Sequence, residues 1–271
     1  MTENIIQALS QIRAKAPLIH YITNYVTVND CANVCLAIGA SPIMADDIDE
    51  MADIASISSC LVINIGTLNK RTVASMLIAA LKANERGVPV VLDPVGAGAS
   101  GLRNETLSTL LAKVRFSVIR GNLSEMRYLV ENQANTKGVD VSDKDMTENP
   151  VEIARRCAKK FDCIAAITGK TDIITDGTRT LSVQNGHEML SSVTGTGCMC
   201  TALIGAFCGA NTDMLTAAAG GILCMGIAGE TAQVTAGQKG LGSFHISLID
   251  GIGNLTAQMI KERAKIYEDS Y

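Results

Sequence analysis

The alternation of short apolar runs with longer amphipathic segments is the feature that most constrains the fold of this chain. Runs rich in Val, Ile and Leu predict buried strands at residues 18–22, 60–66, 88–94, 116–122 and 163–169. Between them, apolar residues recur at helical spacing and predict helices at residues 5–14, 30–38, 69–86, 150–160 and from 124 onward. Apolar strands that alternate with helices are typical of parallel sheets. The sequence therefore predicts an α/β fold with a mainly parallel central sheet flanked by helices on both faces.

The second half of the chain departs from this alternation. Two strand-like segments, 172–175 and 180–183, flank Asp176-Gly177 and predict a β-hairpin. After residue 196, apolar segments predict several long helices up to the end of the chain, and the polar segment 131–149 predicts a long loop. Because no linker, repeat or shift in composition interrupts the sequence, we expect one domain over residues 1–271.

Charge and cysteine usage argue against several classes of function. The net charge is −4, no basic cluster occurs and Trp is absent, so we expect no nucleic-acid partner. The nine cysteines are an odd number, form no Cys-x2-Cys pair and lie mostly in apolar runs. Together with an N-terminal segment that lacks the apolar region of a secretory signal, they predict reduced thiols, a cytoplasmic location and no zinc site.

Two stretches without charged residues, 189–212 and 214–229, raise the question of a membrane. A membrane-spanning helix needs about 20 predominantly apolar residues. The first stretch contains a Gly-Thr-Gly turn that leaves too short an apolar remainder, and the second is rich in Ala and Gly and ends at Glu230. We therefore expect both to be helices packed at the centre of the protein, with no membrane partner.

Polar residues follow the predicted parallel strands at the point where each strand ends. They are Asn24, Asn64, Asp93, Arg120 with Asn122, and Thr168. In open α/β sheets, ligands bind beyond the carboxyl ends of the strands. We expect these residues to lie at one edge of the sheet and to form a site there.

The segment 193–200, VTGTGCMC, leads directly into an apolar helix-like segment. Gly195 and Gly197 permit backbone conformations in which amide N–H groups converge, and the start of a helix adds unpaired N–H groups and the positive end of its dipole. This arrangement predicts a socket for an anion, most often a phosphate, with Cys198 at its mouth. The alternative is an ordinary glycine-rich turn before a buried helix.

Three charged residues are candidates for the same site. Asp93, next to the flexible segment 96–99, suits Mg²⁺ or caps a turn. Glu125 could join it as a second carboxylate, or complete a capping box with Asn122. Arg120 could clamp a nucleotide phosphate, remain a solvated charge or form a structural salt bridge. An anion site, a metal site and a positive charge together are typical of enzymes that transfer phosphoryl groups. The chain contains neither a P-loop motif nor a dinucleotide-binding motif.

Several motifs, taken in order, resemble those of the hydroxyethylthiazole kinase family. They are 22–33 with 39–45, 93–98, 120–122 with 124–125, 167–169 and 195–198. The resemblance covers about residues 20–260. Its N-terminal block is the specific part, whereas the later motifs are similar to those of the wider ribokinase-like superfamily.

The resemblance implies a ribokinase-like fold and ATP-dependent phosphorylation of the primary alcohol of 4-methyl-5-(2-hydroxyethyl)thiazole, a step of thiamine salvage. It implies that Met44 and Gly195 contact this alcohol and that Asn24 lines the same pocket. It also implies a homotrimer with active sites between subunits.

The same resemblance implies which residues serve the nucleotide and its metal. Arg120 and Thr168 would bind ATP, with Asn122 and Gly197 in the same ATP-binding motifs. Asp93 and Glu125 would hold Mg²⁺, directly or through water.

Cys198 stands where most ribokinase-like sugar kinases carry an aspartate base. A thiol at a helix N-terminus can have a lowered pKa, whereas a nearby triphosphate disfavours a second anion. As the candidate catalytic residue, Cys198 either acts as a weak base, positions the hydroxyl group, or only packs. Two other functions stay open at this point: a kinase for hydroxymethylpyrimidine or another small alcohol, and a non-catalytic nucleotide-binding regulatory protein.

Overall fold

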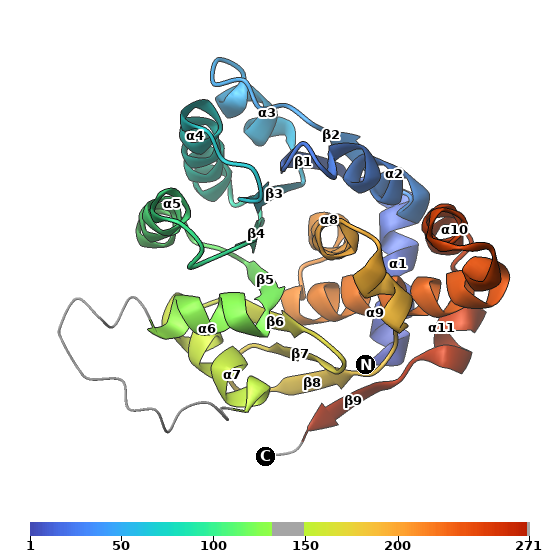
Figure 1. Ribbon diagram of the computed structural model, residues 1–271. Helices are drawn as coiled ribbons and strands as arrows, with labels where there is room; N and C mark the ends of the chain where they lie inside the picture. The colour runs from blue at the N-terminus through green and yellow to red at the C-terminus, as the bar shows by residue number, and fades with distance from the viewer. Residues whose placement is uncertain (132–148, 270–271) are drawn as a thin grey trace.

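The computed structural model describes residues 1–131 and 149–269, which are built around a nine-stranded sheet of order β2-β1-β3-β4-β5-β6-β7-β8-β9 (Figure 1). Six neighbouring strands pair in parallel. They are β2 (Ser41–Ile43), β1 (Leu18–Ile22), β3 (Cys60–Asn64), β4 (Val90–Asp93), β5 (Val118–Asn122) and β6 (Ile164–Thr168). These include all five buried strands that the sequence predicts, and the prediction of a mainly parallel sheet is confirmed.

The predicted hairpin is present as β7 (Asp172–Thr175) and β8 (Thr180–Val183), and β7 also pairs antiparallel with β6. The expectation that helices continue to the end of the chain was wrong. After the last helix, α11 (Ala257–Arg263), the strand β9 (Ile266–Asp269) pairs with β8, with Ile266 opposite Val183. This pairing joins segments far apart in the chain, so the local pattern of a short polar segment does not reveal it.

Helices cover both faces of the sheet, because successive side chains of a strand point to opposite faces. In β3, Val62 packs in one hydrophobic cluster, whereas Leu61 and Ile63 pack in the other. The first cluster lies under α1 (Thr2–Lys15), α2 (Val28–Ile38), α8 (Thr196–Ala210), α9 (Met214–Ala236), α10 (Leu241–Gly253) and α11. The second lies under α3 (Met51–Ile57), α4 (Lys70–Arg86), α5 (Gly101–Lys113), α6 (Leu123–Glu131) and α7 (Pro150–Phe161). Helices α3 and α5 were not predicted, because α3 is short and α5 is weakly amphipathic.

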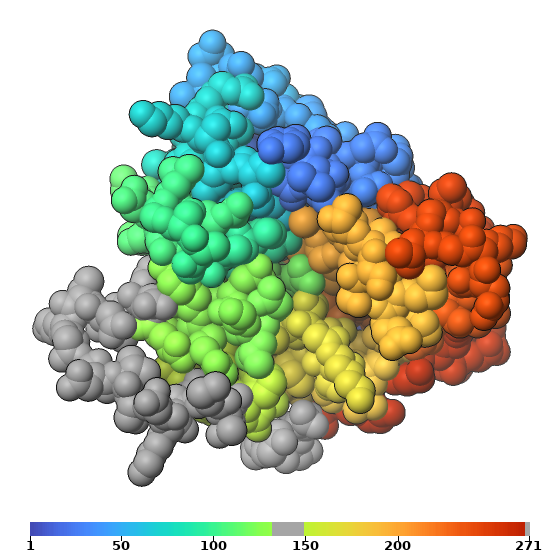
Figure 2. All heavy atoms as spheres, in the orientation of Figure 1, coloured from blue at the N-terminus to red at the C-terminus, as the bar shows by residue number. Residues whose placement is uncertain are grey.

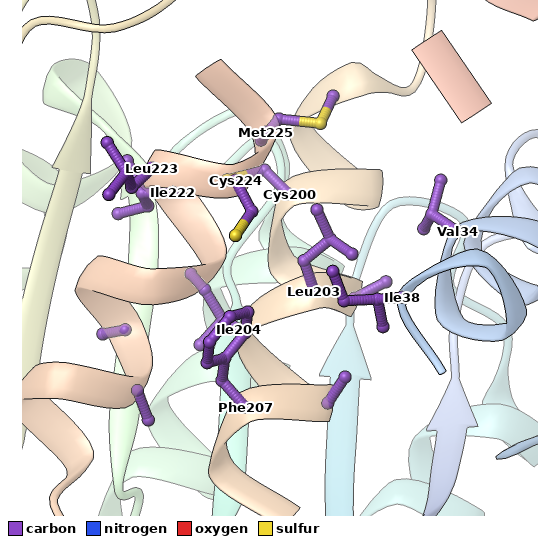
Figure 3. Close-up of a cluster of buried hydrophobic side chains, with 14 of the residues drawn as sticks. Val34, Ile38, Cys200, Leu203, Ile204, Phe207, Ile222, Leu223, Cys224 and Met225 are labelled. Atoms are coloured by element: carbon purple, nitrogen blue, oxygen red, sulfur yellow. The ribbon is translucent and has the colours of Figure 1, made fainter. Parts of the chain in front are cut away.

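Helices α8 and α9 lie at the centre of the first cluster. Figure 3 shows Ile204 and Phe207 of α8 between the neighbouring helices, with Cys224 of α9 directed towards them and Ile222 and Leu223 on the other side of α9. By length and composition, residues 214–239 could cross a membrane, but 83% of their most apolar window is buried inside the structure. This burial agrees with the expectation of a helix packed at the centre of the protein.

Two further expectations concern cysteines and the polar segment. All nine cysteines are free thiols, and Cys198 alone among them is not buried. Most of the predicted loop, residues 132–148, lies outside the residues that the structure describes.

Candidate active site

The start of α8 is the centre of the candidate site. Gly195 precedes the helix with φ of 86°, and no side chain caps the helix start. A side chain at position 195 would overlap the methyl group of Thr27, so this position needs glycine for space as well as for conformation. Because the first N–H groups of α8 have no side-chain acceptor, they and the positive end of the helix dipole favour an anion at this point.

A positively charged side chain, Arg120, lies beside the helix start. A Cβ at Gly197 would lie 2.9 Å from Nη1 of Arg120, so the absence of a side chain lets the guanidinium approach the helix. Arg120 donates a hydrogen bond to Oγ1 of Thr168 and lies 3.7 Å from Oδ2 of Asp93. The structural salt bridge considered from the sequence is therefore present. Nε of Arg120 is buried without a hydrogen-bond partner in the described structure, which leaves one donor of the guanidinium unused.

Two cavities meet at Gly197 and Arg120, which line both of them. The larger cavity, of about 880 Å³, has Thr168 and the apolar side chains of Ile222 and Met225 among its lining residues. The smaller cavity, of about 370 Å³, is lined by residues that follow the strand ends or precede α8, among them Asn24, Gly66, Asp93, Asn122, Glu125, Gly195 and Cys198. Figure 2 shows the N-terminal part of the chain (blue), its middle part (green) and the segment that contains α8 (orange) meeting on one face of the molecule.

Cys198 lies on the wall of the smaller cavity. Its Sγ accepts hydrogen bonds from Nδ2 of Asn24 at 3.3 Å and from Nδ2 of Asn64 at 3.2 Å. Burial raises the pKa of the Cys198 thiol and the charge of Asp93 raises it further, although hydrogen bonds from Thr27 and the two asparagines act in the opposite direction. Because the net shift is upward, Cys198 is a protonated thiol at neutral pH.

Asp93 ends β4 and is fully buried. Its Oδ2 accepts hydrogen bonds from Asn64 at 3.1 Å and from Thr201 at 2.7 Å, whereas Oδ1 has no partner among the described residues. Burial raises the pKa of Asp93 to about 6, although Arg120 and Thr201 act to lower it. A cation beside Oδ1 would give this oxygen a partner and favour the charged carboxylate, so the residue fits a metal ligand.

Glu125 completes the capping box that the sequence analysis considered. Its Oε2 accepts a hydrogen bond from N–H of Asn122 at 2.8 Å, and Oδ1 of Asn122 accepts one from N–H of Glu125 at 2.9 Å. Oε1 accepts a further bond from N–H of Gly96 at 2.9 Å. The same carboxylate lines the smaller cavity with Asp93.

The set of oxygen donors suits a weakly ligated divalent cation. Among the residues that the structure describes, no group of three or more His, Cys, Asp or Glu side chains could hold a metal. A cation at Asp93 and Glu125 would therefore complete its shell with water and substrate oxygens, which is how Mg²⁺ binds at many phosphate sites.

The structure brings together all predicted site residues except Met44, since each of the others lines at least one of the two cavities. Met44 follows β2 and is partly buried against the first hydrophobic cluster. It does not belong to the smaller cavity of its own chain. Its role in binding the alcohol stays a prediction, as do the binding roles of the other residues.

Three residues make contacts at or beside the site that the sequence pattern does not reveal. Asn64 was noted only as a strand end, but it bonds both Cys198 and Asp93. Thr201 lies in an apolar helix, and nothing in its neighbourhood indicated the contact with Asp93. Arg103, on the helix α5 that was not predicted, donates to the carbonyl oxygens of Ile65, Val95 and Gly66. It thereby joins the segments that follow β3 and β4.

Comparison with known proteins gives the same assignment at the level of sequence and fold. The model of the hydroxyethylthiazole kinase family matches residues 9–258. A hydroxyethylthiazole kinase of Ruminiclostridium cellulolyticum is 59% identical over 268 residues, which are 98% of each chain. The structure of a hydroxyethylthiazole kinase protein from Pyrococcus horikoshii OT3 has a TM-score of 0.91 at 38% identity, and the match covers 99% of this chain and 100% of that one.

A more distant structure extends the likeness of fold. A ribokinase-like superfamily protein from Enterococcus faecalis has a TM-score of 0.64 at 10% identity, with 95% of each chain covered. At that identity the likeness shows the fold alone, and it confirms the predicted ribokinase-like architecture. The match of the family model over nearly the whole chain, together with relatives of high identity, shows that this chain belongs to the hydroxyethylthiazole kinase family.

Proposed function

We propose that this chain transfers the γ-phosphate of ATP to the primary alcohol of 4-methyl-5-(2-hydroxyethyl)thiazole. The observation that carries this proposal is the meeting of the two cavities at Gly197 and Arg120. A nucleotide in the larger cavity and a small alcohol in the smaller cavity would face each other across the start of α8. In the reaction, the alcohol oxygen bonds to the γ-phosphorus, the bond to the β–γ bridging oxygen breaks, and the hydroxyl proton is released.

The larger cavity has the composition that a nucleotide requires. Ile222 and Met225 supply an apolar wall for a base, while Arg120 lies where the larger cavity meets the smaller one and is bonded to Thr168. Arg120 brings a permanent positive charge with an unused Nε–H donor. This charge and the N–H groups at the start of α8 bind the phosphate groups and stabilise the negative charge that moves during transfer.

Asp93 and Glu125 hold Mg²⁺ in this proposal, directly or through water. The ion supplies charge neutralisation for the phosphate oxygens when it is bound with the nucleotide. The support from this chain is the unpartnered Oδ1 of Asp93 and the presence of both carboxylates in one cavity. The backbone bonds of Glu125 also fix where its carboxylate lies.

Cys198 positions the hydroxyl group of the alcohol. Its raised pKa makes a thiolate unfavourable before the alcohol binds, so the base role requires the proton to move only as the new bond forms. Asn24 and Gly195 line the same cavity and confine the alcohol there.

A homotrimer with active sites between subunits is part of the proposal. Tyr25 is 80% exposed and Val26 is 54% exposed, and Val26 lines the smaller cavity. A neighbouring subunit that covers this apolar rim would bring its own Met44 to the alcohol, which accounts for the absence of Met44 from the lining of the smaller cavity of its own chain. Sedimentation velocity of the purified protein measures the oligomeric state, and a monomer would contradict this part.

Release of ADP from ATP, measured with and without the thiazole alcohol and with and without Mg²⁺, tests the reaction. We expect release only when all three components are present. Release with hydroxymethylpyrimidine but not with the thiazole would assign the chain to another alcohol. ATP binding without any alcohol-dependent release would indicate a regulatory protein.

A further inference from the structure

Asn64 connects the two reactive groups of the smaller cavity. Its Nδ2 lies 3.2 Å from Sγ of Cys198 and 3.1 Å from Oδ2 of Asp93. The side chain is only 2% exposed, at the carboxyl end of β3 and in register with Asp93 on β4. One amide group therefore bonds the thiol and the carboxylate at the same time.

The neighbours of Asn64 determine which way its amide points. Oδ1 accepts hydrogen bonds from the backbone N–H of Gly66 at 2.9 Å and from Nδ2 of Asn24 at 3.0 Å. A backbone N–H can only donate, so the carbonyl oxygen must face Gly66 and the NH₂ group must face Cys198 and Asp93. The backbone N–H of Gly66 therefore determines which side-chain atom of Asn64 is oxygen and which is nitrogen.

Asn24 is oriented by the same logic. Its Oδ1 accepts from the backbone N–H of Thr27 at 3.1 Å, which directs its NH₂ group towards Cys198. Sγ of Cys198 thus receives two N–H donors from buried amides whose positions are fixed by backbone groups. The S–H proton cannot point at either donor, so the two asparagines restrict the direction in which the thiol can meet a ligand.

We propose that Asn64 is a positioning residue for phosphoryl transfer, which holds the sulfur of Cys198 and the carboxylate of Asp93 at a fixed separation across the smaller cavity. The inference rests on the proposed function for its kinetic consequence, but the contact itself involves only this chain. Asn64 touches no substrate in this scheme and acts through Cys198 and Asp93. Misplacement of a reacting group lowers the rate of transfer more than it weakens binding.

A double-mutant cycle separates this role from a purely structural one. Asn64→Asp keeps the acceptor for Gly66 and Asn24 but replaces the donor with a charged oxygen. Asn64→Ser removes the donor without adding charge, and it also removes the amide acceptor, so an effect that both variants share reports the loss of the donor. We expect each change to lower kcat about 10- to 100-fold with KM for the alcohol little changed. In a Cys198→Ala background, we expect the same change to lower kcat clearly less, because only the contact with Asp93 remains. An equal loss in both backgrounds would overturn the proposal.

Alkylation of the protein without nucleotide provides a second readout. Cys198 is the one cysteine that is not buried, so iodoacetamide reacts with it first, and Cys198→Ala verifies the assignment. Since hydrogen bonds to sulfur favour the reactive thiolate, Asn64→Ser should slow alkylation about fivefold at fixed pH. An unchanged rate would show that the Asn64 donor does not act on the thiol.

Asn84→Asp is the matched control for both measurements. Asn84 also donates and accepts through one amide, to and from the backbone of Arg115 at 2.9 and 2.7 Å, but it lines neither cavity. It should leave kcat and the alkylation rate unchanged. If the wild-type protein shows no thiazole-dependent turnover, the proposed function fails, while the alkylation rates still decide whether Asn64 acts on Cys198.

Discussion

Gly197 and Arg120 approach each other so closely that a Cβ at position 197 would lie 2.9 Å from Nη1 and 3.4 Å from Nη2. The two residues come from α8 and β5, and each of them lines both cavities. Their contact places a positive charge against the start of a helix, and both features favour an anion. The size of residue 197 therefore controls the geometry of the proposed phosphate site.

Gly197→Ala should displace the guanidinium of Arg120 and weaken its contacts with Thr168 and Asp93. We expect kcat/KM for ATP to fall about 10- to 100-fold, because a shift of about 1 Å at a phosphate-positioning group is costly. Steady-state ADP release measures the effect. Gly101→Ala is the matched control, since it also lies in the first turn of a helix but a Cβ there meets nothing within 4 Å. Wild-type kinetics in Gly197→Ala would contradict the proposed role of this contact.

Gly195→Ala should destabilise the fold through its backbone conformation and through a steric overlap, and Gly87→Ala separates these two effects. Position 195 has φ of 86°, and a side chain there overlaps Thr27. Gly87 has φ of 69° but open space around it, so Gly87→Ala should cost only the left-handed conformation, roughly 1–2 kcal/mol. Urea unfolding should show a clearly larger loss of unfolding free energy for Gly195→Ala. Equal losses would mean that the segment at 195 relaxes without cost.

Asp93→Asn and Glu125→Gln test which carboxylates serve Mg²⁺. Glutamine can replace glutamate in a capping box, but its NH₂ group cannot accept the second backbone bond, so Glu125→Gln keeps the bond from Asn122 or the bond from Gly96 and not both. We expect a modest loss of thermal stability together with a rise in the Mg²⁺ concentration needed for half-maximal activity. Asp93→Asn should raise that concentration as well and lower kcat, because it removes the buried negative charge beside the phosphate. Titration of ADP release with Mg²⁺ measures both. If Glu125→Gln keeps the Mg²⁺ dependence of the wild type, Glu125 is a helix cap only.

Asp172 should lower the unfolding free energy as the pH rises from about 4 to above 6, whereas a carboxylate with a lowered pKa does the reverse. Burial raises its pKa to about 6, so the native state holds this proton more tightly than the unfolded chain. The charged form then costs stability above about pH 6, and this cost disappears as the pH falls towards about 4. Asp172→Asn keeps an acceptor for N–H of Gly169 and should raise the unfolding free energy above pH 6 by on the order of 2–3 kcal/mol, with little effect near pH 4.

Asp176→Asn serves as a control of opposite sign. Burial alone would raise the pKa of Asp176, but hydrogen bonds from Thr178 and Arg179 outweigh it and lower the pKa to about 2. A group with a lowered pKa stabilises the native state above the pKa of the unfolded chain, and this stability is lost as the pH falls through the folded value. Asp176→Asn should therefore destabilise the protein at neutral pH. Urea unfolding of both variants at several pH values would show whether the two effects differ in sign.

The position of the site at one edge of the sheet could be predicted from the sequence. Apolar strands such as 60–64 and 90–93 end in Asn64 and Asp93, and parallel strands bring their carboxyl ends to the same edge. The importance of Gly195 and Gly197 could be predicted as well. The positive φ of Gly195 and the close approach of Arg120 to Gly197 restrict these positions to glycine. Both predictions depend on short segments of sequence, a single strand in the first case and the start of one helix in the second.

The amino-acid sequence by itself determined the alternating architecture, the polar strand ends and the motifs of the family. These features depend on hydrophobic periodicity and local backbone preference, which involve only residues close to one another in the chain. Tertiary structure alone decided which groups touch: Thr201 bonds Asp93, Asn64 bonds Cys198, and β9 pairs with β8. These contacts join residues that are distant in the chain, and their geometry depends on how helices and strands pack. The chemistry of Cys198 and Asp93 follows from that packing, since burial and the direction of hydrogen bonds set the protonation of both groups.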